Sequence, residues 1–94
     1  MDIDQQVKVF KAVSDATRLR ILDVLPAKPL CKDMYNVCEL VDELGGSQPN
    51  MSRHLQILKE AGLVQCRKAC SSVYYWRVPN AFKQIRDALK RFAT

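Results

Sequence analysis

A chain of 94 residues has the size of one small domain, and its 15 Lys and Arg against 10 Asp and Glu give a formal net charge of +5. The positive charge favours a polyanionic partner such as nucleic acid, while no apolar run is long enough to span a bilayer. Because the first residues, MDIDQQ, also lack the basic and apolar regions of a signal peptide, we expect a cytoplasmic protein with no membrane segment.

Two helices are predicted before the first proline. The apolar positions of the first, over residues 4–13, are Ile3, Val7, Phe10 and Val13. Ser14 or Asp15 can cap the second, whose apolar positions are Leu19, Leu22 and Leu25. Prolines 26 and 29 prevent its continuation and open a loop that runs to residue 33.

The next stretch has the signals of two helices joined by a tight turn. Apolar spacing predicts a short helix over residues 37–44, which ends at two glycines. Ser47 can then cap a second helix, and Pro49 suits its first turn, where a missing N–H costs nothing. We predict this helix over residues 48–61. Such a pair is a helix-turn-helix, in which the second helix enters the DNA major groove.

The second helix of this pair has one apolar and one polar face. Met51, Leu55 and Leu58 form the side that packs. The other side carries amide, hydroxyl and guanidinium groups, which hydrogen-bond base edges and phosphates. The side chains predicted to contact DNA here are Ser47, Gln48, Asn50, Ser52, Arg53, His54 and Gln56. The same pattern alone is also typical of an ordinary amphipathic surface helix. The neighbouring elements therefore decide between a recognition helix and a surface helix.

A β-hairpin and a last helix complete the chain. Residues 63–68 and 73–78 are rich in β-branched and aromatic side chains and are separated by small and polar residues. A hairpin after a recognition helix can lie along the DNA backbone or in the minor groove as a wing. Its predicted contacts are Arg67, Lys68, Ser71 and Ser72. Pro79 stops the second strand, and Asn80 can cap a helix that runs to about Phe92.

The predicted fold is mainly α with a β-hairpin: one winged helix-turn-helix DNA-binding domain over residues 1–94, with five helices and a two-stranded wing. The three central helices and the hairpin can close a core alone, so the apolar stripes of the first and last helices have no obvious partner. Pairing of these helices in a homodimer would cover them and would predict an inverted-repeat operator. The alternative is that both helices pack on their own core.

Five short motifs are spaced along the chain. They are SDATRLRIL (residues 14–22), VCEL (37–40), SQPNMSRHL (47–55), LKEAGLV (58–64) and VYY (73–75). In this order they resemble the ArsR/SmtB family of bacterial repressors, and the likeness covers nearly the whole chain. The resemblance implies a homodimeric winged helix-turn-helix repressor that an inducer releases from its operator. It does not identify the inducer.

Members of that family place inducer sites in different elements. Zinc sensors resembling SmtB use Asp and His ligands on the last helix, where this chain offers Asp87 and no His. Arsenic sensors resembling ArsR itself use Cys-Val-Cys at the start of the third helix. At that place this chain reads Asn36-Val37-Cys38, which keeps the second cysteine and lacks the first.

The four cysteines are therefore candidates for thiol chemistry in a reducing compartment. A thiophilic metalloid takes about three soft ligands, and Cys38, Cys66 and Cys70 are the metal ligands we expect, with Cys31 as a further candidate. Cys66 and Cys70 can meet only if the chain turns between them, because four residues of extended strand span on the order of 13 Å. The alternative is that each cysteine is a small buried apolar residue. His54, the only histidine, is more typical of a hydrogen-bonded helix residue or a phosphate contact than of a ligand.

No catalytic triad, phosphate loop or paired-carboxylate site can be assembled, so the sequence does not predict an enzyme. We predict a DNA-binding transcriptional repressor that needs no cofactor to bind DNA and is released by As(III), another soft metal or thiol oxidation. The alternative is a winged-helix module for protein-protein contact without its own operator. The polar recognition face argues against it, because a protein-binding face carries apolar or aromatic anchors.

Overall fold

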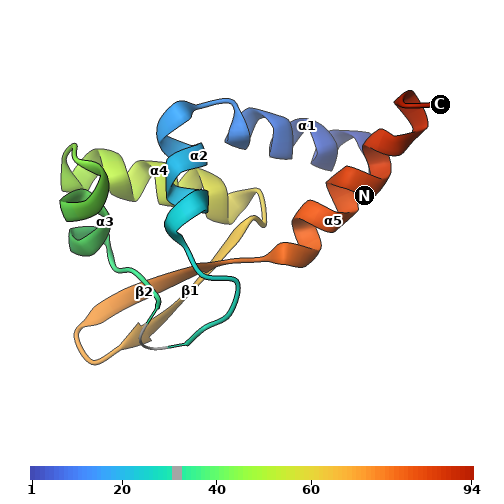
Figure 1. Cartoon of the computed structure of the whole chain (residues 1–94). Helices are drawn as coiled ribbons and strands as arrows, with labels where there is room; N and C mark the ends of the chain where they lie inside the picture. The colour runs from blue at the N-terminus through green and yellow to red at the C-terminus, as the bar shows by residue number, and fades with distance from the viewer. Residues whose placement is uncertain (31–32) are drawn as a thin grey trace.

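A computed structural model describes residues 1–30 and 33–94, so a role for Cys31 lies outside the described residues. Within these ranges the chain forms five α-helices and a two-stranded hairpin, which confirms the predicted winged helix-turn-helix (Figure 1). The elements are α1 (Ile3–Val13), α2 (Ala16–Val24), α3 (Val37–Leu44), α4 (Gln48–Glu60), β1 (Val64–Ala69), β2 (Ser72–Arg77), α5 (Pro79–Leu89) and a 3₁₀ turn, η1 (Lys90–Phe92). None of the helices described is both long and apolar enough to cross a bilayer.

Side-chain caps set the starts of the first four helices. The caps are Asp2, Asp15, Asn36 and Ser47, and each accepts a hydrogen bond from the backbone N–H three residues further on. The cap of α3 is reciprocal, because Asn36 Oδ1 accepts from Glu39 N at 2.8 Å while Glu39 Oε1 accepts from Asn36 N at 3.0 Å. This capping box satisfies two backbone donors that the helix itself leaves free.

Helix α5 begins differently from the prediction. Its N-cap is Val78, without a side-chain hydrogen bond, and Pro79 occupies the first helical position. The predicted cap at Asn80 is therefore wrong. Proline at this position has a backbone φ already suited to the helix and no N–H to satisfy, so the helix can start one residue before Asn80.

The hydrophobic core lies between α1, α2, α3, α4 and the start of β1. The predicted packing face of α4 is confirmed, because Met51, Leu55 and Leu58 are buried. Leu25 at the end of α2 is also buried, whereas Leu19, at the same apolar spacing, is 49% exposed. Helix α4 is thus enclosed along its apolar side by all the other core elements.

Helix α1 has two apolar faces. Val9 and Ala12 are buried in the core beside the polar Gln6. The predicted stripe lies on the other face, where Ile3 is 60% exposed and Val7 is also exposed. The prediction that the core closes without α1 is therefore wrong. Of the predicted stripe, Val13 packs against the core, while Ile3, Val7 and Phe10 remain uncovered within one chain.

Helix α5 leaves the body of the molecule at the end of β2 and runs toward the start of α1 (Figure 1). None of its residues is fully buried, although Phe82 and Ile85 pack against the core. Beyond it, Arg91 Nη2 donates to the buried Gln6 Oε1 at 3.2 Å, which joins the two ends of the chain. Leu89 is 41% and Phe92 71% exposed, so this end of the chain has an open apolar surface.

The hairpin has a shorter turn than predicted. Strands β1 and β2 pair antiparallel from Val64↔Arg77 to Ala69↔Ser72, which leaves only Cys70 and Ser71 in the turn. Cys70 has φ 57°, a left-handed conformation that favours glycine and costs another residue about 1 kcal/mol. Ala69 and Ser72, expected in the turn, instead form the last pair of the ladder.

The two asparagines offer a matched test of helix capping. Asn36→Ala removes the capping box of α3 and should lower the free energy of unfolding by about 0.5–2 kcal/mol. Asn80→Ala removes no cap and should cost less than about 0.5 kcal/mol. Urea unfolding of both variants at one protein concentration measures the difference, and equal losses would contradict the capping assignment.

Candidate nucleic-acid interface

Helices α3 and α4 are joined by the tight turn that a helix-turn-helix needs. Gly45 N donates to Val41 O at 2.7 Å and ends α3. Gly45 and Gly46 then have φ 83° and 89°, which residues with a Cβ rarely adopt. The chain therefore reverses within two residues, and Ser47 starts α4 directly.

The outer face of α4 is polar and open to solvent. The predicted contacts that are exposed on this helix and at its cap are Ser47, Gln48, Asn50, Ser52, Arg53 and Gln56. They lie opposite the buried leucines of the same helix. Since a recognition helix reads DNA mainly with its N-terminal half, base contacts through the exposed polar residues between Ser47 and Arg53 stay a prediction.

Three of these polar side chains already have partners within the chain. Ser47 Oγ accepts from Asn50 N at 3.3 Å, and Gln56 Nε2 donates to Glu60 Oε1 at 3.1 Å. Gln48 Nε2 donates to Cys38 Sγ at 3.1 Å, a contact between the first residue of α4 and the first turn of α3. These bonds order the side chains before any ligand binds.

His54 is half-buried against α2 rather than directed outward. Its Nδ1 lies 3.3 Å from Arg18 Nη1 and 3.8 Å from Asp15 Oδ2. Because a guanidinium only donates, Nδ1 is the acceptor in the Arg18 contact, and in the neutral ring Nε2 carries the hydrogen. His54 is thus a hydrogen-bonded helix residue, which was one of the two roles expected for it.

Arg18 connects this histidine to α1. Its Nε donates to Ala12 O at 2.6 Å and its Nη2 to Lys11 O at 3.3 Å, so it covers carbonyl groups at the end of α1. One side chain therefore joins α1, α2 and α4. Arg18 lies within the motif at residues 14–22, but no sequence pattern singled it out as the residue that connects these helices.

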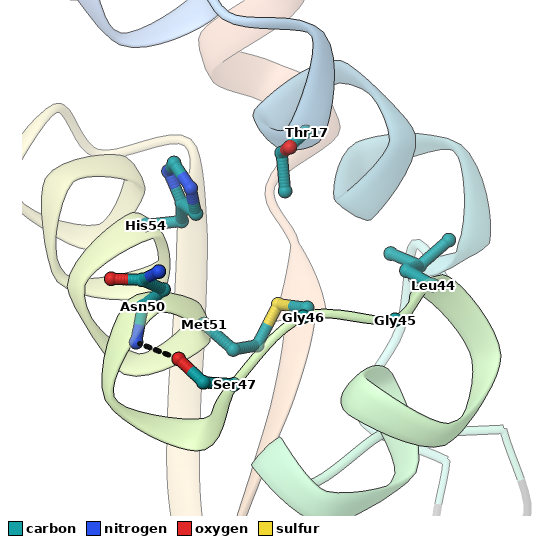
Figure 2. A pocket seen from close by; sticks show the side chains of 8 residues that line it. All are labelled: Thr17, Leu44, Gly45, Gly46, Ser47, Asn50, Met51 and His54. Carbon is teal, nitrogen blue, oxygen red and sulfur yellow. Dashed lines mark hydrogen bonds between the residues drawn. The ribbon is translucent and has the colours of Figure 1, made fainter.

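A small pocket of about 160 Å³ lies where the start of α2 faces the helix-turn-helix turn (Figure 2). The residues that line it are Thr17, Leu44, Gly45, Gly46, Ser47, Asn50, Met51 and His54. Its volume is well below the roughly 300–1,000 Å³ of sites for drug-sized ligands. Thr17, which no sequence pattern singled out, shares the pocket with Asn50 and His54 of the recognition helix.

The wing presents positive charge on both of its faces. Arg67, Lys68 and Ser71 are exposed, and Ser72 is half-buried. Arg67 and Lys68 are neighbours in β1 and pair with Tyr74 and Val73, so they point to opposite sides of the hairpin. The two side chains therefore project from opposite faces of the wing.

The three cysteines within the described residues lie in three different places. Cys38 is exposed at the start of α3, Cys66 is half-buried in β1 opposite Tyr75, and Cys70 is exposed in the hairpin turn. Strand β1 stays extended from Cys66 through Ala69, so the chain turns too late to bring Cys66 and Cys70 together. Over residues 1–30 and 33–94 no three His, Cys, Asp or Glu side chains form a group that could hold a metal ion.

The family's inducer positions have other uses here. Asn36, which stands where arsenic sensors have their first cysteine, is the N-cap of α3. Asp87 on α5 forms exposed ion pairs with Arg86 at 3.2 Å and with Lys90 at 3.7 Å.

Burial raises the pKa of Tyr75 in β2. The nearby Cys66 also raises this pKa and Lys59 lowers it, so the Tyr75 phenol stays protonated at neutral pH.

A tight-turned helix pair with a polar outer helix, followed by a basic hairpin, defines a winged helix-turn-helix DNA-binding domain. Residues 15–65 match the family described as bacterial regulatory protein, arsR family. The chain therefore belongs to the ArsR family, as the motifs predicted.

Known relatives are transcriptional regulators. The chain is 40% identical over 83 residues to an uncharacterized HTH-type transcriptional regulator of Methanocaldococcus jannaschii, covering 87% of this chain and 88% of the relative. It is 40% identical over 75 residues to the arsenical resistance operon repressor of Escherichia coli, covering 79% of this chain and 60% of the repressor. An ArsR-like transcriptional regulator from Rhodococcus sp. RHA1 has the same fold, with a TM-score of 0.81, 26% identity and coverage of 96% of this chain and 80% of that chain. The prediction of a transcriptional regulator rather than an enzyme is confirmed.

Two basic residues should affect DNA binding in different ways. Arg53→Ala should weaken binding to a selected operator duplex by about 1–3 kcal/mol, the worth of a good base-edge contact, and relax specificity at one position. Lys68→Ala should weaken all duplexes about equally and reduce the salt slope by about 1. Gel shifts at several salt concentrations measure both effects.

Lys83→Ala is the control, because it removes the same charge as Lys68→Ala from the exposed surface of α5. This variant should bind like the parent. If Arg53→Ala and Lys68→Ala also bind operator and random duplexes like the parent, then α4 and the wing do not form the interface.

Proposed function

We propose that this chain is a cytoplasmic transcriptional repressor that binds an inverted-repeat operator as a homodimer and is released by chemistry at the Cys38 thiol. The observation that carries the proposal is the 3.1 Å contact between Gln48 Nε2 and Cys38 Sγ. It joins a candidate base-reading residue to the cysteine that matches an inducer position of the arsenic sensors. The arsenical resistance operon repressor among the relatives supports the same inducer class.

Two kinds of reagent fit an exposed thiol at this place. Arsenite would form a sulfur–arsenic bond and release one water for each thiol bound, and another soft metal ion would replace the thiol proton. Hydrogen peroxide would instead oxidise the thiol to a sulfenic acid and be reduced to one molecule of water. Each reaction alters the atom that accepts the Gln48 hydrogen bond.

Release requires that the inducer favour the free protein over the DNA complex. A 100-fold weakening of operator binding corresponds to about 2.7 kcal/mol of coupling free energy. Part of this coupling free energy would come from displacement of the Gln48 side chain. The rest would come from the steric effect of a group attached to the Cys38 sulfur, where α3 and α4 meet. Both changes act at the N-terminal end of α4, where base contacts are made.

The homodimer is supported by the apolar surface that one chain leaves open. Ile3 and Phe10 on α1 are exposed, as are Leu89 and Phe92 near the C-terminus. The Arg91–Gln6 hydrogen bond holds these two parts of the chain against each other. A two-fold pairing over this surface would bury it and place two α4 helices on successive half-sites.

Two substitutions within α5 of the full chain test the dimer. Leu89→Asp places a charge in the proposed interface and should raise the dimer dissociation constant by more than about tenfold. Gln84→Asp, at an exposed position of the same helix, should leave it unchanged. Sedimentation of both variants decides, because an intact dimer with Asp at position 89 would remove this residue from the interface. A charge at Phe82 would test folding instead of dimerisation, because Phe82 packs against the core of its own chain.

The inducer can be tested on the thiols. Cys38→Ser should bind operator like the parent while losing most of its release by arsenite or peroxide, because the hydroxyl keeps a hydrogen-bond acceptor but is a poor soft-metal ligand. Cys66→Ser and Cys70→Ser are the matched controls, and each loses the response only if it shares the site. Gel shifts with rising arsenite measure release, and unchanged release in all three variants would exclude Cys38, Cys66 and Cys70 as sensors.

The alternative of a protein-protein module makes a different prediction for DNA. Its exposed apolar anchors would belong on the outer face of α4, whereas the exposed apolar side chains Ile3 and Phe92 lie at the chain ends instead. A salt-dependent, sequence-selective gel shift on the promoter region of the protein's own gene supports the repressor. Absence of any selective shift would favour the protein-protein module.

A further inference from the structure

The hydrogen bond between Gln48 and Cys38 fixes the direction of an amide group. Nε2 of Gln48 donates to Cys38 Sγ, while the amide oxygen accepts no hydrogen bond from any described residue. A primary amide has two N–H groups, so one remains available as well. The side chain is therefore left with a free carbonyl and a single free N–H.

Both residues stand on well-anchored backbone. Cys38 lies in the first turn of α3, which the Asn36–Glu39 capping box fixes. Gln48 is the first residue of α4, between the Ser47 cap and Pro49. The backbone on both sides of this contact is thus anchored, and the sulfur offers an acceptor to a side chain that would otherwise rotate freely in water.

A free carbonyl beside a free N–H matches one base in the major groove. Adenine presents the N6 amino donor next to the N7 acceptor, and an amide can contact both. Guanine presents two acceptors, O6 and N7, and would face the amide carbonyl with an acceptor. If the amide turned over, its N–H groups could donate to guanine instead.

We infer that Cys38 is a positioning residue for operator recognition: its sulfur holds the Gln48 amide so that the carbonyl faces the bases, and this selects adenine over guanine at one position of each half-site. The inference rests on operator binding through α4, as proposed above. It gives the same cysteine a role in specificity in the absence of any inducer. Attachment of arsenic or oxygen to the sulfur then changes base preference as well as affinity.

The experiment begins with the full-length parent protein and a library of random DNA duplexes, from which bound sequences are selected. Duplexes with adenine or guanine at each position of the selected half-site then give the preference at that position. The variants are Cys38→Ala, Cys38→Ser, Gln48→Ala and the double variant, with Cys66→Ala as a control that removes a thiol elsewhere.

Cys38→Ala should lower the preference for adenine over guanine at one position by about three- to tenfold, with unchanged binding to random duplexes. Gln48→Ala should abolish the preference at the same position, and Cys38→Ala should then add nothing. Cys38→Ser keeps an acceptor and should retain the preference within about twofold. Cys66→Ala should behave like the parent. A merely structural role of Cys38 would weaken all duplexes together.

The outcomes separate this inference from the proposed function. If the parent selects no sequence, both fail. If the parent selects an operator but Cys38→Ala has the parental preference, the positioning role is overturned and the repressor remains. The same holds if Gln48→Ala leaves the preference unchanged, because Gln48 then reads no base.

Discussion

The burial of one side of α4 determines what its other side can do. Leu55 and Leu58 are fully enclosed by the remaining core elements, and Met51 nearly so. Successive helical residues differ by about 100° around the axis, so a change of one residue in this packing would turn Arg53 and its neighbours away from the groove. The interface therefore depends on the hydrophobic core, because the same helix provides both.

The fold was largely predictable because its signals are local. The caps at Asp15 and Ser47, the apolar spacing of the helices and the glycines after residue 44 place the ends of three helices within about a residue. The faces of α1 were not predictable in this way, because its buried side includes Gln6 and Ala12, which do not read as apolar anchors. Periodicity identifies an apolar stripe, but it does not say whether the same chain covers it.

The candidate site was predictable in composition but not in its internal contacts. The polar face of α4 follows from helical geometry alone, whereas the Cys38–Gln48 and Arg18–His54 bonds join residues 10 and 36 positions apart. Such pairs depend on the angle between helices, which no local pattern contains. The expected cluster of thiols does not form among the described residues for a different reason, because β1 remains extended past Cys66 and the turn comes only after Ala69.

The replacement of a ligand by a cap explains how one thiol can remain effective. Asn36 gives α3 a reciprocal cap, worth about 1 kcal/mol, at the position that the resemblance assigns to the first cysteine of the arsenic sensors. Because this cap anchors the first turn of α3, we expect a group added to the Cys38 sulfur to displace the Gln48 amide directly instead of being absorbed by motion of α3. In the proposed mechanism, a single thiol in contact with Gln48 therefore needs no second thiol to move the helix.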